Sequence, residues 1–265
     1  MTLRGNKPPV AILCGGYGSR LSEETARIPK PMIEIGELPM VCHIMNIYAS
    51  YGFTEFYLLL GYKADYIKRY FLHFPILQGD FTVHTGTRET TVTRQTRRSD
   101  WIIHLVDTGM DTTTGGRLGR LKDRIDGTFM MTYGDGVSDV SIPELLAAHA
   151  SAGTVATVTA IRASGRFGML ACEADNRVVS FEEKPQTGDN WINGGFFVFE
   201  PSIFDYLEDD FIHLEGEVLG RLSQARELTA YKHEGFWACM DTLRDKQHLE
   251  RLWQEGRAPW KIWRD

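Results

Sequence analysis

The stretch LCGGYGSRLSEETARIPKP, residues 13–31, decides how the rest of this sequence is interpreted. It follows an apolar run that ends at Leu13 and is typical of a short buried strand, and it then loses hydrophobic periodicity. Gly15, Gly16 and Gly18 lack the Cβ atoms that would keep a ligand away from the backbone, so their N–H groups can surround an anion. The glycines predict a phosphate-binding loop, with an ordinary strand-to-helix turn as the alternative.

Two cations in the same stretch favour the phosphate-binding interpretation. Arg20 presents a planar fork of donors and Lys30 a compact ammonium, and both suit phosphate oxygens. A dinucleotide-binding fingerprint is excluded because Leu21 stands where its third glycine is required. A P-loop is excluded because the sequence contains no Gly-Lys pair. The stretch is therefore predicted to hold a nucleoside triphosphate with a different kind of loop.

Composition narrows the class of protein. The chain has 265 residues, 43% of them hydrophobic, which is enough for one substantial α/β core. A net charge of −6 argues against a nucleic-acid partner. The sequence contains no apolar run of about 18 residues, so it predicts no membrane span. The first residues lack the apolar core of a signal peptide, and we therefore expect a soluble, cytoplasmic protein. The four cysteines contain no CxxC pair and are interpreted as buried thiols.

Short apolar strands alternate with amphipathic helices along the chain. Strands are predicted at residues 56–60, 102–106, 129–133 and 154–160, and helices from Pro39 and over 64–71. His43 lies in the first of these helices and is interpreted as a structural side chain. This alternation predicts βαβ crossovers and an α/β fold with a parallel sheet.

Two segments depart from this rhythm. We expect one domain over residues 1–265, with an inserted β arm at 73–101 and a C-terminal helix and tail at 242–265. The arm is rich in threonine, and a solvated face or a subunit contact is favoured for it over substrate binding.

A second glycine-basic turn precedes a predicted helix near residue 118. Thr114 is a candidate cap for this helix, which would leave Gly115, Gly116 and Arg117 at its N-terminus, where exposed N–H groups favour an anion or a base carbonyl. A plain helix start explains the same residues equally well.

Two aspartates are candidate metal ligands. Asp135 stands between Gly134 and Gly136, directly after a predicted strand, where open α/β sheets bind their ligands. A hairpin turn is the alternative, but the residues that follow do not form an antiparallel return strand. Asp241 lies at the start of the last helix, and a helix cap is its alternative role.

A third polar group lies in FEEKP, residues 181–185, and in the INGGFFVF strand that follows it. Lys184 can place an ammonium near a sugar phosphate, and Glu183 can accept hydrogen bonds from sugar hydroxyls. Asn193 offers both a donor and an acceptor to a hydroxyl. Taken alone, Glu183 and Lys184 are interpreted as a surface ion pair.

The complete pattern resembles a known family. Leu-x-Gly-Gly-x-Gly-x-Arg-Leu with Pro-Lys-Pro at the end of the loop is similar to the signature of the sugar-1-phosphate nucleotidylyltransferases. This resemblance implies a Rossmann-like, mixed but mostly parallel sheet flanked by helices, and a homo-oligomer. Further segments, among them LVDTG, TGGRL, TYGDGVSDV, INGGFF and MDTLRDK, resemble members that join CTP to glucose 1-phosphate, giving CDP-glucose and diphosphate with Mg²⁺.

The resemblance also assigns roles by position. The nucleotide would lie against Leu13, Gly15, Gly16, Gly18, Arg20, Lys30, Gly115, Gly116, Arg117 and Asp135. The sugar phosphate would lie against Gly168, Glu183, Lys184, Asn193 and Gly194, and the metal against Asp135 and Asp241. The catalytic side chains would be Arg20, Lys30, Asp135 and Lys184.

The sequence departs from the family pattern at Glu37, Leu38, Cys42 and around Leu214. The phosphate and metal positions are intact, but the segment around Leu214 lies where the family approaches its sugar. Three readings therefore stay open at this point: the reaction above, the same chemistry with another nucleotide or phosphorylated acceptor, and a non-catalytic nucleotide-sugar sensor.

Overall fold

A seven-stranded sheet forms the centre of the computed structural model, which describes residues 7–95, 100–164, 169–172, 178–182 and 186–263. The strands lie in the order β14-β10-β13-β8-β1-β4-β7. Their bounds are Leu228–His233, Ala156–Ser164, Gln186–Phe199, Phe129–Tyr133, Val10–Cys14, Glu55–Leu60 and Ile102–Asp107, in that order. Strand β13 is antiparallel to both of its neighbours, and the other pairs are parallel. The predicted mixed, mostly parallel α/β sheet is confirmed.

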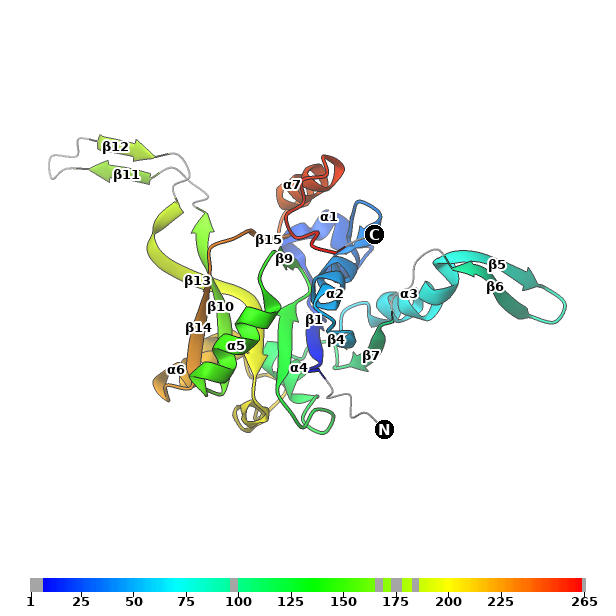
Figure 1. Ribbon diagram of the computed structural model, residues 1–265, viewed down its shortest axis with the longest axis horizontal. Coiled ribbons are helices and arrows are strands. Elements are labelled where there is room, and N and C mark those ends of the chain that lie inside the picture. The colour runs from blue at the N-terminus through cyan, green and yellow to red at the C-terminus, as the bar shows by residue number, and fades with distance from the viewer. Residues whose placement is uncertain (1–6, 96–99, 165–168, 173–177, 183–185, 264–265) are drawn as a thin grey trace.

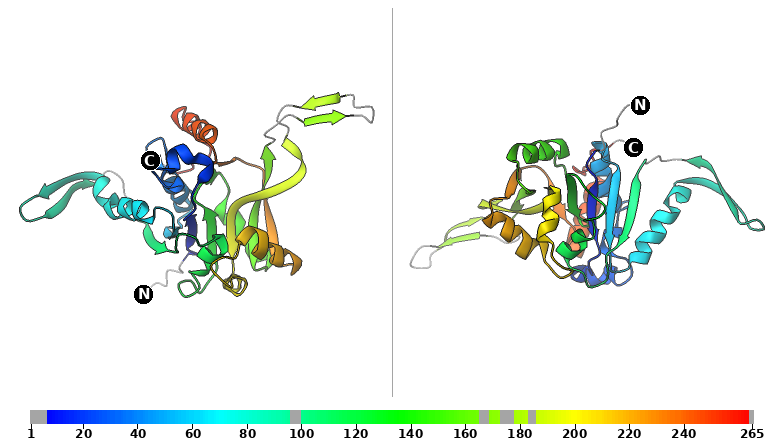
Figure 2. Two further views of the ribbon diagram at one scale, coloured as in Figure 1. Left: turned by 180° about the vertical axis from the view of Figure 1, so that it is seen from behind. Right: turned by 90° about the horizontal axis from the view of Figure 1, so that it is seen from below.

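Helices cover both faces of this sheet (Figures 1 and 2). The α-helices are α1 Ser22–Thr25, α2 Met40–Ser50, α3 Ala64–Leu77, α4 Thr114–Gly119, α5 Ile142–Ala152, α6 Leu219–Gln224 and α7 Leu243–Gln254. The 3₁₀-helices are η1 Ser19–Leu21, η2 Lys30–Met32 and η3 Pro201–Tyr206, and η4 Leu214–Val218 is a π-helical turn. Among the described residues, no helix combines the length and the apolar character that crossing a bilayer requires.

Alternation along the central strands builds a core on each face. Val10, Ile12 and Cys14 of β1 point into the core that contains α2 and α7, whereas Ala11 points into the opposite core with Leu118 and the segment after β13. Successive side chains of a strand point to opposite faces, so a run that is apolar at every position must be buried on both. This explains why VAILC lies at the centre of the sheet.

Two β-hairpins project from opposite ends of the molecule (Figures 1 and 2). One pairs β5, Gly79–His84, with β6, Glu89–Gln95, and follows α3, which continues to Leu77. The other pairs β11, Met169–Cys172, with β12, Val178–Glu182. A small hairpin joins β2, Glu34–Ile35, to β3, Leu38–Pro39, and a separate two-stranded antiparallel sheet pairs β9, Gly136–Ser138, with β15, Trp237–Cys239.

An aromatic cluster ties the C-terminal tail to α2. His43 is fully buried, its Nε2 donates to the Ile35 carbonyl at 2.9 Å, and its Nδ1 accepts from Trp260 Nε1 at 3.3 Å. The imidazole also meets the ring of Trp253 edge-on, with 4.7 Å between centroids. The structural interpretation of His43 is therefore confirmed, and the cluster anchors the helix that follows Asp241.

Candidate active site

The loop after β1 lies at the carboxyl end of the parallel strands. It borders a cavity of about 500 Å³. The lining residues are Leu13, Gly15, Gly16, Tyr17, Gly18, Ser19, Arg20, Lys30, Pro31, Met110, Asp111, Thr112, Thr113, Thr114, Arg117, Tyr133, Gly134, Asp135 and His213. Most of the residues that the sequence assigned to the nucleotide are thus brought together around one concave surface.

The three loop glycines differ in what an added Cβ atom would meet. A Cβ at Gly15 would overlap the buried guanidinium of Arg117. Gly18 has φ +64°, a left-handed conformation that glycine adopts without strain, and a Cβ there would lie 2.8 Å from Thr25. At Gly16 a Cβ would meet no atom within 4 Å. The predicted reason for all three, access of a ligand to the backbone, therefore fits Gly16 best, whereas packing explains Gly15.

Arg117 is a buried hub beneath the cavity. Its Nη1 donates to Leu60 O, Thr108 Oγ1 and Gly109 O at 3.1, 2.6 and 2.7 Å, and its Nη2 donates to Gly15 O and Met110 O at 3.1 and 3.0 Å. Burial lowers the pKa of the guanidinium from its usual value. These contacts fix the loops after β1, β4 and β7 relative to one another.

Gly115 and Gly116 pack against Ile212 and the backbone of Asp210 rather than facing the cavity. A Cβ at Gly115 would lie 2.6 Å from the Ile212 carbonyl oxygen, and one at Gly116 would overlap the backbone of Asp210. The helix also begins differently from the expectation: Thr113 is its N-cap residue, and the Thr114 hydroxyl donates to Glu215 at 2.7 Å. The described contacts of this turn are structural, and its contact with a nucleotide stays a prediction.

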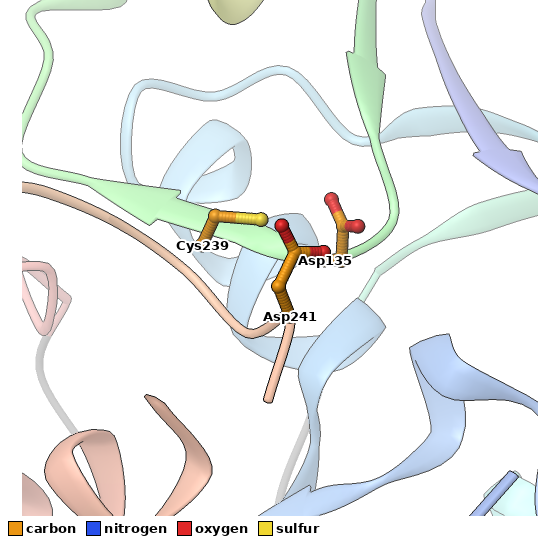
Figure 3. A group of neighbouring side chains, drawn as sticks. All are labelled: Asp135, Cys239 and Asp241. Carbon is orange, nitrogen blue, oxygen red and sulfur yellow. The ribbon is translucent and has the colours of Figure 1, made fainter. Parts of the chain in front are cut away.

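Asp135 and Asp241 lie side by side although they are far apart in the sequence (Figure 3). Strand β9 follows Asp135, and β15 precedes Asp241. The antiparallel pairing of these strands, with Gly136 opposite Cys239, brings the aspartates together. The N–H of Met240 donates to the Asp135 carbonyl at 2.8 Å. Their proximity is thus a consequence of the antiparallel pairing of two short strands that are distant in the sequence.

The alternative roles of the two aspartates do not hold in the structure. Strand β9 pairs with β15 and does not return along β8, so the turn at Asp135 is not a simple hairpin. Thr242 caps α7 in a reciprocal capping box with Asp245, so Asp241 is not the cap. Both carboxylates are instead directed toward cations.

Lys30 bridges the two carboxylates. Its Nζ lies 2.6 Å from Asp135 Oδ2 and 2.7 Å from Asp241 Oδ1. Burial by itself lowers the pKa of Lys30, but the charge of Asp135 and the hydrogen bonds to both aspartates outweigh it and raise the pKa. Arg20 Nη1 lies 2.7 Å from Asp241 Oδ2. The loop that was predicted to hold phosphates therefore contacts the predicted metal ligands directly.

The donor set fits a hard divalent cation. Asp135, Asp241 and Cys239 each offer a ligand atom, and these atoms lie within 4.8 Å of one another (Figure 3). Burial, followed by the charge of Asp135, raises the pKa of the Cys239 thiol, so the neutral thiol is a poor ligand. The two carboxylates are the effective donors, and oxygen ligands of this number suit Mg²⁺.

A second cavity, of about 850 Å³, is lined in part by Asp241. It is lined by Ile161, Arg162, Ile192, His233, Glu234, Gly235, Phe236, Trp237, Ala238, Cys239, Asp241, Asp245 and His248. The two aspartates thus stand between two cavities, since Asp135 lines the first and Asp241 the second.

The predicted sugar-phosphate residues divide into two groups. Gly168, Glu183 and Lys184 lie outside the described residues. Asn193 Nδ2 donates to the Tyr133 hydroxyl at 3.1 Å, and the Gly194 carbonyl accepts from Trp237 Nε1 at 2.6 Å. Asn193 therefore lies near the first cavity through Tyr133, and Gly194 near the second through Trp237.

Sequence reasoning missed a polar chain that crosses the site. The Tyr133 hydroxyl donates to Glu215 Oε1 at 2.8 Å, and Glu215 also accepts from Thr114. Burial, followed by the charge of Glu215, raises the pKa of Tyr133. His213 lines the first cavity next to this chain. No local pattern marks these residues, because their contacts join positions about 80 to 100 apart.

Comparison with known proteins shows which family this chain matches. The nucleotidyl transferase family model matches residues 10–238. A glucose-1-phosphate cytidylyltransferase of Salmonella typhi is 46% identical over 254 residues, which cover 95% of this chain and 98% of that protein. A probable glucose-1-phosphate cytidylyltransferase of Bacillus subtilis is 43% identical with the same coverage. A crystal structure of a putative glucose-1-phosphate thymidylyltransferase from Bacillus anthracis has a TM-score of 0.66 at 17% identity, covers 98% of each chain, and shares the fold.

Proposed function

The chain belongs to the nucleotidyl transferase family, and on that premise we propose that it transfers the cytidylyl group of CTP to α-D-glucose 1-phosphate. The products are CDP-glucose and diphosphate. The observation that carries the proposal is the pair of cavities that meet at Asp135 and Asp241, with the glycine loop, Arg20 and Lys30 on one side. Relatives that share 43 to 46% of their residues with this chain carry the same activity in their names.

The reaction needs positioning more than acid–base chemistry. A phosphate oxygen of glucose 1-phosphate forms a bond to the α-phosphorus of CTP, and the bond from that phosphorus to the β-phosphate oxygen breaks. The second pKa of a phosphate monoester is about 6, so the attacking oxygen is already anionic at neutral pH and needs no general base. The main barrier is the approach of two anions, which cations and fixed geometry lower.

This chain supplies those cations from its first loop. We assign Arg20 and Lys30 to the triphosphate, because both line the first cavity and both already contact anionic oxygens. Gly16 leaves the backbone open to the same ligand. Arg117 acts beneath them as a positioning residue, since its donors go to backbone carbonyls and the Thr108 hydroxyl rather than into the cavity.

Asp135 and Asp241 would hold a divalent cation, which we propose to be Mg²⁺. When bound, the ion neutralises phosphate charge and orients the triphosphate for in-line displacement. The thiol of Cys239 lies beside the pair, but sulfur is a soft ligand that suits Mg²⁺ poorly, so we assign it no ligand role.

The second cavity is the better candidate for the sugar phosphate. We propose that Glu183 and Lys184 serve it, as the resemblance implies, with Gly194 at its border and Asn193 on the side of the first cavity. Among the departures from the family pattern, the segment around Leu214 reaches the site, because Glu215 contacts Tyr133 and Thr114. Neither cavity's described lining includes Glu37, Leu38 or Cys42, and Leu214 is buried in the core.

The β5–β6 hairpin supports the proposal that the protein is a homo-oligomer. Phe81 and Val92 face each other across the two strands, and Val83 lies on the same face. These side chains are 42%, 40% and 52% exposed. An isolated two-stranded ribbon with an uncovered apolar face is marginal in water, so a second copy of the chain is the proposed cover.

A substrate panel tests the proposed function. The protein is incubated with Mg²⁺, each nucleoside triphosphate and several sugar 1-phosphates, and the products are identified by mass. CDP-glucose as the dominant product is expected. Formation of a different nucleotide sugar would support the transfer reaction but refute the proposed substrates. If no nucleotide sugar forms, the proposed transferase activity is wrong.

A further inference from the structure

The two proposed metal ligands, Asp135 and Asp241, already form ion pairs with cationic side chains of the protein. Lys30 Nζ contacts Asp135 Oδ2 and Asp241 Oδ1 at 2.6 and 2.7 Å. The second oxygen of Asp241 accepts from Arg20 at 2.7 Å. Two carboxylates this close repel each other, and a shared ammonium offsets that repulsion. A divalent ion that requires these oxygens must therefore replace a cation that is already there.

We propose that Lys30 occupies the cation position in the free protein, so that a divalent ion binds tightly only when a triphosphate draws Lys30 away from the aspartates. This rests on the proposed function, because the ion and the triphosphate are those of the transfer reaction. An incoming triphosphate offers the ammonium new anionic oxygens and offers the ion additional ligands. Metal and nucleotide then bind with positive coupling, and each strengthens the other by the same factor.

The local structure allows the Lys30 side chain to move while its backbone stays in place. Lys30 begins η2 between Pro29 and Pro31, and both prolines restrict the main chain. Its flexible four-carbon stem can turn the ammonium from the aspartates toward the cavity that Lys30, Arg20 and Asp135 all line. The movement therefore needs no rearrangement of the loop.

Lys30 rather than Arg20 carries most of this effect. The Lys30 side chain is 11% exposed and contacts both aspartates, whereas the Arg20 side chain is 71% exposed and, of the two aspartates, contacts Asp241. Solvent screens an exposed ion pair strongly, and such pairs contribute little. Removing the charge of Lys30 should therefore free the metal ligands, and removing the charge of Arg20 should free them much less.

Binding of Mn²⁺ alone tests the proposal without any turnover. The free Mn²⁺ signal in electron paramagnetic resonance is titrated with full-length wild type, Lys30→Met and Arg20→Met, in the absence of nucleotide. Lys68→Met is the matched control, because Lys68 forms an ion pair with Asp107 at 2.9 Å on β7. Lys30→Met is expected to bind Mn²⁺ at least about tenfold more tightly than wild type. The repulsion between one unit charge and a neighbouring ion is larger than the free energy that corresponds to a tenfold change in affinity. Lys68→Met should match wild type. Equal or weaker binding by Lys30→Met would overturn the proposal.

A crystal structure of the wild type keeps the proposal testable if Lys30→Met does not fold. Crystals are soaked in Mn²⁺ with and without a non-hydrolysable CTP analogue, and the ion is located by anomalous scattering. We expect no Mn²⁺ between the aspartates without the analogue. With the analogue, we expect Mn²⁺ there and Lys30 Nζ beyond hydrogen-bond distance of both carboxylates. Mn²⁺ bound between the aspartates while Lys30 still contacts both would refute the competition.

The two proposals fail in different ways. If the substrate panel yields no CDP-glucose, the proposed function is wrong whatever Mn²⁺ does. If CDP-glucose forms but Lys30→Met binds Mn²⁺ no more tightly than wild type, only the competition between Lys30 and the ion is wrong.

Discussion

Acidification should destabilise the fold through His43. Its Nδ1 accepts from Trp260, so a proton at Nδ1 would face an N–H donor and break this contact. Burial disfavours the imidazolium and lowers the pKa of His43 from 6.5 to about 4, although the hydrogen bond to Ile35 opposes the shift. The unfolded chain therefore binds the extra proton between these two values, and stability falls as the pH drops through this window.

The size of the effect follows from the two pKa values. Each unit of difference corresponds to about 1.4 kcal/mol, so His43 should remove about 2 kcal/mol of the free energy of unfolding between pH 7 and pH 5, and about 3 kcal/mol by pH 4. The loss concerns the site as well as the fold, because the His43 cluster anchors the tail that follows α7. Weakening this cluster should loosen the position of Asp241 before α7.

Urea unfolding at pH 7 and pH 5 measures this contribution, with His43→Gln as the comparison. The variant should be about 1 to 3 kcal/mol less stable at pH 7, because buried hydrogen bonds are lost. It should lose about 2 kcal/mol less than wild type on going to pH 5, since other titrating groups act equally in both proteins. An equal loss in the two proteins would refute the assignment of this pH dependence to His43.

The remaining predictions concern the loop and the second substrate. Gly15→Ala should lower the free energy of unfolding by about 1 to 3 kcal/mol, because its Cβ would overlap Arg117. Gly16→Ala should leave the free energy of unfolding unchanged and raise the KM for CTP. Equal losses of stability in the two variants would contradict the packing role of Gly15. Arg117→Met should cost about 3 kcal/mol or more in urea unfolding, because several buried carbonyl groups lose their donor; a neutral result would rule out the hub. Lys184→Ala should raise the KM for glucose 1-phosphate more than that for CTP, and equal increases would reject the assignment of Lys184 to the sugar phosphate.

Local sequence was enough to predict the central strands and the sheet. The apolar run that ends at Leu13 and the one before Asp135 had to be buried on both faces, so their place in a parallel sheet followed from their composition. The helix at residues 40–50 was equally clear from its periodicity. These elements carry their own signal because burial on one or two faces fixes which positions are apolar.

The relations between distant segments could not be predicted in this way. Nothing near Gly15 indicates that Arg117 fills the space beside it, and a phosphate loop explained the same glycine. The contact of Lys30 with Asp241 joins residues 211 positions apart, and it depends on the pairing of β9 with β15. Such partners are chosen by tertiary packing, so the candidate residues were predictable but their contacts with one another were not.

We propose that Asp135 and Asp241 form the reacting centre between the two cavities. Release of pyrophosphate from CTP and glucose 1-phosphate, measured with saturating Mg²⁺ for wild type and Asp135→Asn, tests it most directly. The variant keeps the size of the side chain, and its fold is checked by its unfolding curve. Turnover should fall by about a thousandfold or more, because the loss of a charged group at a phosphoryl-transfer centre removes several kcal/mol of stabilisation. Pyrophosphate release near the wild-type rate by a folded Asp135→Asn protein would show that Asp135 is not part of the reacting centre.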